Sequence, residues 1–232
     1  MRIISLTLLM AVVLGIGQTG CSKEEKKADV EKSATTTTTE QASQPQYNFD
    51  SLAAIRYPIR NESNKFVTLV TDYGNMTLEL YHDVAPAHTD SFVARTMDGF
   101  YDSTIFHRVM DRFMIQGGDP TGTGGGRTDY TLDAEFSNLP HKEGTLSMAR
   151  SMDPNSASCQ FFICLDSNRM TASLDGKYTI FGHLVKGYDV LHKIGSVECV
   201  SNPANPREMS KPKENVNLTR VYMSDAEGNE IK

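Results

Sequence analysis

The pattern of apolar and polar residues divides the chain into three stretches. Residues 1–20 carry an apolar run from Ile3 to Ile16, which follows Arg2 and ends among small residues. Residues 21–48 carry charged residues, a threonine run and almost no large apolar side chains. From residue 49 to residue 232, short apolar runs alternate with turn-forming residues. This division predicts a signal peptide, a flexible tether and one folded domain.

The leader ends at Cys21, and this position suggests a membrane anchor. The apolar run is too short to span a bilayer comfortably as a helix, so it is typical of a cleaved signal peptide. Cys21 directly after Gly20 resembles the lipobox of bacterial lipoproteins, in which the new N-terminal cysteine is lipidated. Gln18 stands where that pattern usually has leucine, so plain secretion and an uncleaved anchor remain alternatives. We expect a protein of the bacterial cell envelope, on the periplasmic or outer-membrane face, with a lipid anchor at Cys21.

Short alternating runs dominate the folded domain. Residues 66–71 and 76–81 alternate in polarity on either side of Asp72-Tyr73-Gly74-Asn75, which predicts a β-hairpin. Further β-rich runs occur at 145–149, 160–165, 179–185 and 217–223. Many short strands with glycine-rich turns favour a closed antiparallel barrel, since closure removes exposed strand edges.

Two segments have the pattern of helices. Pro86 suits the first turn of a helix that ends at Asp98 before Gly99, and a second helix is expected over Tyr188–Ile194. The buried stripe of the first helix is predicted to consist of Phe92, Val93, Thr96 and Met97. Residues 200–215 contain three prolines and are expected to form a loop.

Charge and composition exclude some classes of partner and site. The net charge is −6, and the longest basic block is Lys26-Lys27, so nucleic acid is not an expected partner. The six histidines include no i, i+4 pair, which argues against a zinc site. Outside the leader three cysteines remain, Cys159, Cys164 and Cys199, and spacing does not decide whether two of them form a disulfide.

The segment Phe106–Asp119 (FHRVMDRFMIQGGD) combines apolar side chains with two arginines, a glutamine and a glycine pair. It predicts a strand, a tight turn near Asp111-Arg112 and a second strand that ends at Gly117-Gly118. If the second strand alternates, Phe113 and Ile115 share one face, and Met114 and Gln116 share the other. A guanidinium, an amide and apolar side chains would then converge on one surface.

This segment resembles the signature of the cyclophilins, the peptidyl-prolyl isomerases, whose motif is F-H-R followed by F-M-x-Q-G-G-D. Ser158–Ile163 (SCQFFI) resembles a second motif of the family, S-Q-F-F-I. The resemblance covers about residues 66–223. It implies a mainly β fold, a closed eight-stranded antiparallel barrel capped by two α-helices, and rotation about Xaa-Pro peptide bonds as the activity. It also implies proline-containing polypeptides as substrates, here unfolded or partly folded envelope proteins, with no cofactor. We expect a monomer.

The reaction needs neither a nucleophile nor a metal. Resonance gives the peptide C–N bond a rotation barrier of about 18–20 kcal/mol. A protein lowers this barrier by binding the twisted amide better than either planar form. Twisting localises a lone pair on the prolyl nitrogen, so a hydrogen-bond donor aimed at that atom helps. The resemblance assigns this catalytic role to Arg108, and the alternative is an arginine that merely pairs with a surface carboxylate.

The resemblance also assigns substrate-binding residues. Those expected to line the proline pocket are Phe113, Met114, Phe162 and Leu174. Gln116 and Gln160 would hold the substrate backbone and orient the arginine. The remaining expected contacts lie before the proline or at the pocket rim: Ala149, Arg150, Ser151, Gly122, Thr123 and Tyr178.

Three residues depart from the family pattern. Ser173 replaces a tryptophan that matters for cyclosporin binding, Tyr178 replaces a histidine, and Arg150 replaces an asparagine. Cyclosporin sensitivity is therefore left open. We hypothesise that Arg150 favours substrates with an acidic residue near the proline; a lack of preference for Glu-Pro over Lys-Pro peptides would refute this.

Other interpretations of the sequence remain open. The glycine loop at 122–126 suggests phosphate binding, but it lacks the Lys-Ser/Thr ending of a P-loop. Residue types alone leave Ser-His-Asp hydrolysis open, although no Gly-x-Ser-x-Gly motif is present. A proline-binding, chaperone-like module with little catalysis would use the same site residues, and a structural lipoprotein would use none of them.

Overall fold

The structure is a computed structural model, and it describes residues 65–231 of the chain. The predicted signal peptide, Cys21, the tether and the start of the expected domain lie outside the described residues. Within residues 65–231, no helix has the length and apolar character needed to cross a membrane.

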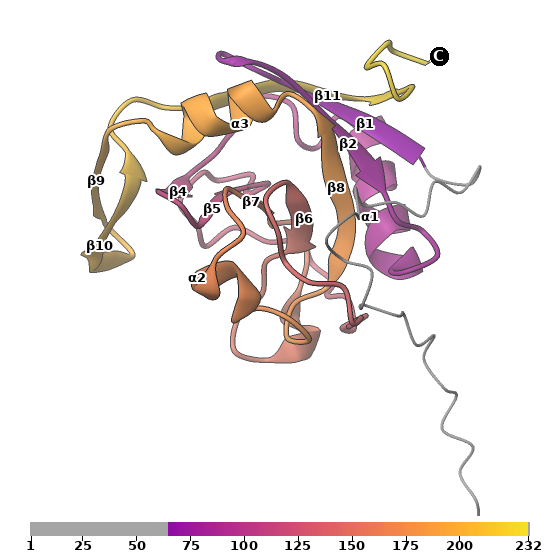
Figure 1. Ribbon diagram of the computed structural model, residues 1–232, viewed down its shortest axis with the longest axis horizontal. Coiled ribbons are helices and arrows are strands. Elements are labelled where there is room, and N and C mark those ends of the chain that lie inside the picture. Colours follow the sequence, from indigo (N-terminus) through magenta and orange to yellow (C-terminus); the bar gives the residue numbers. More distant parts are fainter. Residues whose placement is uncertain (1–64, 232) are drawn as a thin grey trace, which may run out of the picture. The chain divides into compact units, whose positions relative to one another are not determined.

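Nine strands form one curled, antiparallel sheet, whose hydrogen-bonded order is β3-β11-β1-β2-β8-β6-β7-β5-β4 (Figure 1). The predicted first hairpin is confirmed as β1 (Lys65–Thr71) and β2 (Gly74–Leu80), and the signature forms β4 (Arg108–Met110) and β5 (Met114–Gly117). The other strands are β3 (Thr104–Ile105), β6 (Thr145–Met148), β7 (Phe161–Cys164), β8 (Ile180–Lys186) and β11 (Asn217–Ser224).

The expected closed barrel of eight strands is not confirmed. In the described part of the chain, the sheet is open between its end strands β3 and β4. Only Phe106 and His107 separate these two strands, and Phe106 is fully buried. A Cβ at Gly117 would lie 3.1 Å from the Phe106 ring, so this ring packs directly on the glycine of β5. The chain therefore passes from one end strand of the sheet to the other through a two-residue connection whose phenylalanine packs in the core.

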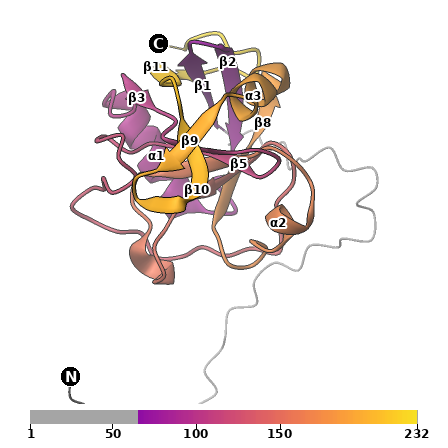
Figure 2. The same ribbon diagram turned by 90° about the vertical axis from the view of Figure 1, so that its left-hand side faces the viewer.

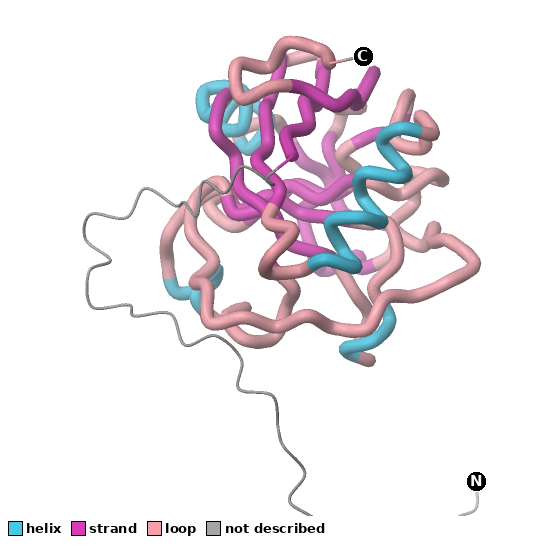
Figure 3. The backbone as a smooth tube through the Cα atoms, turned by 90° about the vertical axis from the view of Figure 1, so that its right-hand side faces the viewer, coloured by secondary structure: helices cyan, strands magenta, loops and turns pink. Residues whose placement is uncertain are grey.

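The core lies between the sheet and helix α1 (Pro86–Met97), which packs on β8 and β11 (Figure 3). The Phe92 ring centroid lies 4.9 Å from that of Tyr101 and 5.3 Å from that of Phe161. The predicted buried stripe is correct for Phe92, Val93 and Thr96 but wrong for Met97, which is 73% exposed. Met97 is the last residue of the helix.

Two shorter helices follow α1 in the described part of the chain. The predicted second helix is confirmed as α3 (Tyr188–Gly195), which packs on β2, β4 and β5. Helix α2 (Arg169–Ala172) was not predicted, because it spans a single turn. Its start is fixed by a capping box, in which the Asn168 side chain accepts from backbone N–H groups and Thr171 bonds back to Asn168. A 3₁₀ turn follows β6, at Pro154–Ser156.

The loop expected over residues 200–215 is wrong, since this segment forms a second, two-stranded sheet. Strands β9 (Cys199–Asn202) and β10 (Asn205–Pro212) pair antiparallel, and β10 lies against β4 (Figures 1 and 2). The prolines do not prevent this pairing: Pro203 lies in the turn, Pro206 lies where the register shifts, and Pro212 ends β10. Proline is tolerated at strand ends and irregularities, where no ladder N–H is needed.

The three cysteines of the described residues are free thiols. Cys159 and Cys164 are buried and Cys199 is half-buried. Burial raises the pKa of each thiol, so all three stay protonated at neutral pH. The disulfide that spacing left open does not form.

Candidate active site

The signature hairpin forms one wall of a pocket of about 420 Å³. Most of the expected site residues line this pocket: Arg108, Phe113, Met114, Gln116, Thr123, Ala149, Arg150, Phe162, Leu174 and Tyr178. Six further lining residues were not predicted: His107, Gly124, Asn202, Ala204, Asn205 and Glu208. The pocket therefore unites several segments that lie between His107 and Glu208 in the sequence.

Strand register explains why the central side chains meet. Arg108 pairs with Gln116 across β4 and β5, and Gln116 pairs with Phe162 across β5 and β7. Residues in register across a sheet point to the same face, so these three form one row. The intervening Ile115 lies in the main core instead. The alternation of β5 predicted from the sequence thus correctly places Met114 and Gln116 on one face.

The predicted position of Phe113 beside Ile115 is wrong. Phe113 precedes β5 and lies in the turn, where strand alternation does not apply. Arg112, just before it, has a φ of 53°, which confirms the tight turn. The turn directs Phe113 to the cluster around Met114 rather than to the core.

One half of the pocket is apolar. Met114, Phe162 and Cys164 form a small buried cluster separate from the main core, with Met110, Phe113, Ala149, Leu174 and Tyr178 packed against it. The Tyr178 ring meets Phe162 edge-on, with the ring centroids 5.8 Å apart. Such a concave aromatic surface suits a small aliphatic ring.

The other half is polar and centres on the Arg108 guanidinium. Its Nη1 donates to Gln116 Oε1 at 3.2 Å, and its Nη2 lies 3.0 Å from the Met110 sulfur. Nε and Nη2 donate to the two oxygens of Glu208 at 2.6 and 2.9 Å. Arg108 therefore pairs with a carboxylate, as the alternative interpretation expected, but it also lines the pocket.

Gln160 connects the row of Arg108, Gln116 and Phe162 to the glycine loop at 122–126, but it does not line the pocket. Its Oε1 accepts from Gln116 Nε2 at 2.9 Å, and its Nε2 donates to the carbonyls of Gly124 and Gly126. Gln160 therefore fixes the amide of Gln116, whose oxygen faces Arg108. The expected role in orienting the arginine fits this geometry, and the expected contact of Gln160 with the substrate backbone stays a prediction.

The glycine loop is closed around a buried carboxylate. Asp119 accepts from the backbone N–H groups of Thr121, Gly124 and Gly126, at 2.7, 2.5 and 3.1 Å. Burial alone would raise the pKa of Asp119, but these hydrogen bonds lower it below its usual range, so the carboxylate stays ionised. The loop's N–H groups are therefore used internally, which removes the basis for phosphate binding.

This arrangement predicts unequal effects for two neighbouring glycines. A Cβ at Gly126 would lie 1.8 Å from Asp119 Oδ1, whereas at Gly125 the nearest atom would be 3.7 Å away. We expect Gly126→Ala to lower the free energy of unfolding by about 1–3 kcal/mol, as for other overpacked sites. Gly125→Ala is the matched control and should leave the denaturation midpoint within experimental error. Equal midpoints for the two variants would contradict the closed loop.

Besides Gln160, two further expected contact residues lie outside the pocket. Gly122 has a φ of +66°, and a Cβ there would approach the Ile105 side chain, so this glycine serves the backbone turn. The Ser151 hydroxyl hydrogen-bonds to the Ser156 hydroxyl at 2.7 Å and so closes the 3₁₀ turn. Neither residue is among those that line the pocket.

Arg150 lines the pocket but is anchored to the backbone. Its guanidinium lies 4.5 Å from the centroid of the Tyr178 ring and donates to the carbonyls of Lys177, Ser151 and Met152. These contacts place a positive charge beside the aromatic wall. The hypothesis that Arg150 favours acidic substrates stays a prediction.

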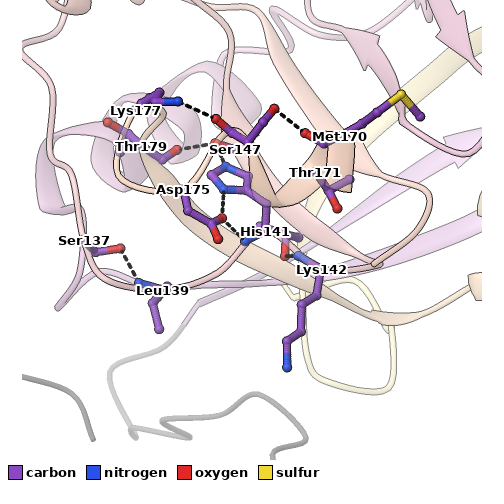
Figure 4. A network of polar contacts seen from close by, with 12 residues as sticks. Ser137, Leu139, His141, Lys142, Ser147, Met170, Thr171, Asp175, Lys177 and Thr179 are labelled. Carbon is purple, nitrogen blue, oxygen red and sulfur yellow. Dashed lines mark hydrogen bonds and ion pairs between the residues drawn. The ribbon is translucent and has the colours of Figure 1, made fainter. Parts of the chain in front are cut away.

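A serine, a histidine and an aspartate form a chain behind the pocket (Figure 4). His141 Nδ1 lies 3.0 Å from Asp175 Oδ1, and His141 Nε2 lies 3.1 Å from Ser147 Oγ. The Ser147 hydroxyl donates to the Thr179 carbonyl at 2.8 Å and is fully buried. A serine without access to substrate does not act as a nucleophile, so hydrolysis is excluded here. The His141 ring instead stacks on Phe162 from behind, with ring centroids 6.0 Å apart.

The unpredicted residues differ in how far the sequence could have revealed them. His107 precedes Arg108 in the signature, so its proximity could have been expected. Both of its ring nitrogens are buried without a partner. Burial lowers its pKa, Arg108 adds to this, and Asp119 opposes it. Glu208 is 100 positions from Arg108, and no pattern in the sequence links the two.

Within residues 65–231, no group of three or more His, Cys, Asp or Glu side chains is arranged to hold a metal ion. The pocket itself presents a charged, planar donor, Arg108, beside an apolar cluster. Such a site can bind an apolar ring and donate a hydrogen bond to an atom next to it.

Comparison with known proteins shows which family has a similar sequence and fold. The family model described as "Cyclophilin type peptidyl-prolyl cis-trans isomerase/CLD" matches residues 66–223. The peptidyl-prolyl cis-trans isomerase ppi1 of Schizosaccharomyces pombe is 43% identical over 152 residues, covering 62% of this chain and 96% of that protein. A peptidyl-prolyl cis-trans isomerase of Acinetobacter baylyi is 42% identical over 139 residues, covering 58% of this chain and 74% of its own.

Some relatives are much longer. The match to isomerase 9 of Schizosaccharomyces pombe is 39% identical and covers 68% of this chain but only 25% of that protein. Among solved structures, a cyclophilin-type isomerase of Cryptosporidium parvum, crystallised in the presence of the dipeptide Ala-Pro, has a TM-score of 0.61 and 33% identity. The likeness covers 69% of this chain and 99% of the other. The chain therefore belongs to the cyclophilin-type peptidyl-prolyl cis-trans isomerase family.

Proposed function

We propose that this peptidyl-prolyl isomerase rotates Xaa-Pro bonds with Arg108 as its catalytic donor. The observation that carries the proposal is the row formed by Arg108, Gln116 and Phe162. This row sets a permanently charged donor at one end of an apolar pocket. The proline ring would lie against Phe113, Met114 and Phe162, while an N–H of Arg108 meets the prolyl nitrogen.

The physical basis is selective binding of the twisted amide. In a planar Xaa-Pro bond, the nitrogen lone pair is delocalised and accepts hydrogen bonds poorly. Rotation localises the lone pair, so a donor held at that position binds the transition state more strongly than the ground state. A fixed donor of this type, in a site partly shielded from water, is worth about 2.7–4 kcal/mol. The uncatalysed exchange takes tens to hundreds of seconds, so such a contribution is readily measured.

The proposed substrates are proline-containing segments of unfolded or partly folded polypeptides. The apolar half of the pocket suits a small aliphatic ring. The polar half, which contains Arg108 and Gln116, suits a peptide backbone. The Cryptosporidium structure, which was obtained with Ala-Pro, supports a short proline peptide as the minimal ligand.

The experiment that separates a catalyst from a proline-binding chaperone is the refolding of a protein whose slow phase is limited by proline isomerisation. The full chain should accelerate that phase when present at about one molecule per hundred substrate molecules, since a catalyst turns over. A chaperone-like module would act only near stoichiometric amounts and would delay refolding. That second pattern would refute catalysis as the main function.

The proposed location is the bacterial cell envelope, with the enzyme acting as an anchored monomer. The support is the apolar leader followed by Gly20-Cys21 and a polar tether. We expect Cys21→Ser to move the protein from the membrane fraction to the soluble fraction of a bacterial host. Cys199→Ser is the matched control and should not change partitioning. A wild-type protein found in the soluble fraction would contradict the lipid anchor.

A further inference from the structure

The β9–β10 hairpin forms a wall of the active-site pocket. It supplies Asn202, Ala204, Asn205 and Glu208 to the lining, and β10 lies directly against β4, the strand of Arg108 (Figure 1). Cys199, at the start of the hairpin, contacts the Val109 carbonyl of the same strand. The hairpin is therefore packed against the strand that carries the catalytic donor.

Glu208 binds the guanidinium along one complete edge. Its Oε1 accepts from Arg108 Nε at 2.6 Å and its Oε2 accepts from Nη2 at 2.9 Å, a bidentate geometry. The second Nη2 hydrogen is available to the Met110 sulfur, and Gln116 accepts from Nη1. Of the five N–H groups of the guanidinium, four then have acceptors within the described residues. One N–H of Nη1 remains for a substrate.

The carboxylate is itself held in place by the hairpin. Ser210 Oγ donates to Glu208 Oε1 at 2.5 Å, and Asn202 Nδ2 donates to Ser210 Oγ at 3.1 Å. Ser210 is fully buried, so these contacts are fixed by packing. The hydrogen bond from Arg108 lowers the pKa of Glu208 below its usual range, which keeps the carboxylate ionised at neutral pH.

The ion pair between Arg108 and Glu208 is expected to contribute little to the stability of the fold. The side chains of Arg108 and Glu208 are 29% and 18% exposed, and partly solvated ion pairs contribute little to stability. The ion pair should have a larger effect on the orientation of the guanidinium, since an arginine side chain has several rotatable bonds that this contact restricts. Without Glu208, the partners of the guanidinium among the described residues would be Gln116, through a 3.2 Å hydrogen bond, and the Met110 sulfur, through a weak contact.

We propose that Glu208 is a positioning residue, which orients the Arg108 guanidinium so that one N–H of Nη1 is presented to the prolyl nitrogen. This inference rests on the proposed function of Arg108. It makes the β9–β10 hairpin part of the catalytic apparatus, although it contributes no group to the reaction itself.

Glu208→Gln tests the proposal, because it keeps the shape of the side chain but turns one acceptor into a donor that faces the guanidinium. In the full chain, with an Ala-Pro peptide as substrate, we expect kcat to fall about ten-fold, as for other misoriented catalytic groups, while KM stays within about two-fold. Glu208→Asp keeps the charge and should recover part of the lost kcat. Glu198→Gln, which breaks the exposed pair with Lys213 just before the same hairpin, is the matched control and should behave as wild type.

A double variant separates positioning from folding. If Glu208 acts through Arg108, adding Glu208→Gln to Arg108→Ala should lower the rate no further. A fall in the denaturation midpoint without a fall in kcat would overturn the proposal, and so would an unchanged or increased kcat in Glu208→Gln. If Arg108→Ala alone keeps full activity, the proposed function itself fails, whatever Glu208→Gln shows.

Discussion

Replacing Arg108 by alanine is expected to lower kcat/KM for Xaa-Pro isomerisation by about 10²–10³-fold, the loss seen when one preorganised transition-state donor is removed. The reason is that Arg108 places a permanently charged donor in register with Gln116 and Phe162, whereas the guanidinium of Arg150 donates to backbone carbonyls. The substitution should leave peptide affinity nearly unchanged, because the proline pocket is intact. Exchange spectroscopy on a short proline peptide measures the rate, and a titration measures the affinity.

Arg112 provides the matched control for that experiment. It lies in the same hairpin and is exposed, and its ion-pair partner within residues 65–231 is the exposed Asp111, at 3.5 Å. Arg112→Gln should retain the full rate. If both variants lose activity equally, the effect would come from the hairpin's net charge, and the specific role of Arg108 would be contradicted.

Alanine substitution of the adjacent Phe161 and Phe162 is expected to give opposite phenotypes. Phe161 is fully buried against Phe92, Tyr101 and Phe106, with ring centroids 5.3 to 6.2 Å apart. Its removal opens a sealed cavity and should cost about 3–5 kcal/mol of unfolding free energy. Phe162 lines the pocket instead, so its removal should cost less stability but lower kcat/KM by about ten-fold or more.

Chemical denaturation and steady-state kinetics of the two variants measure these effects. At a temperature where Phe161→Ala is still folded, it should keep most of its activity, while Phe162→Ala loses it. Equal stability losses together with equal activity losses would contradict the division of β7 into a core face and a site face.

Much of this division follows from the sequence alone. The alternation in Met114-Ile115-Gln116 and in Phe161-Phe162-Ile163 determines which side chains face the core and which face the pocket, because strand side chains alternate with period two. Helix α1 follows from Pro86 and Gly99 in the same way, since both act locally. These local signals predicted the shared face of Met114 and Gln116 and the extent of helix α1, whereas most of the pocket residues were assigned by the resemblance to the cyclophilins.

Other features depend on contacts between distant segments. The strand order of the sheet, with β3 and β4 at its ends, depends on pairings between distant strands, and the contact of Glu208 with Arg108 depends on where the β9–β10 hairpin lies. Phe113 was misplaced because a turn, and not a strand, sets its direction. The three prolines of residues 200–215 suggested a loop, since their positions relative to the strand register could not be known beforehand.

The most direct test of the central claim is the cis–trans exchange rate of an Ala-Pro peptide, measured by NMR with catalytic amounts of the full chain. The account predicts that exchange, which takes tens to hundreds of seconds unaided, becomes faster in proportion to protein concentration. It also predicts that the cis:trans ratio of the free peptide does not change. An unchanged exchange rate in the presence of folded, peptide-binding protein would contradict the account and identify the pocket as a binding site only.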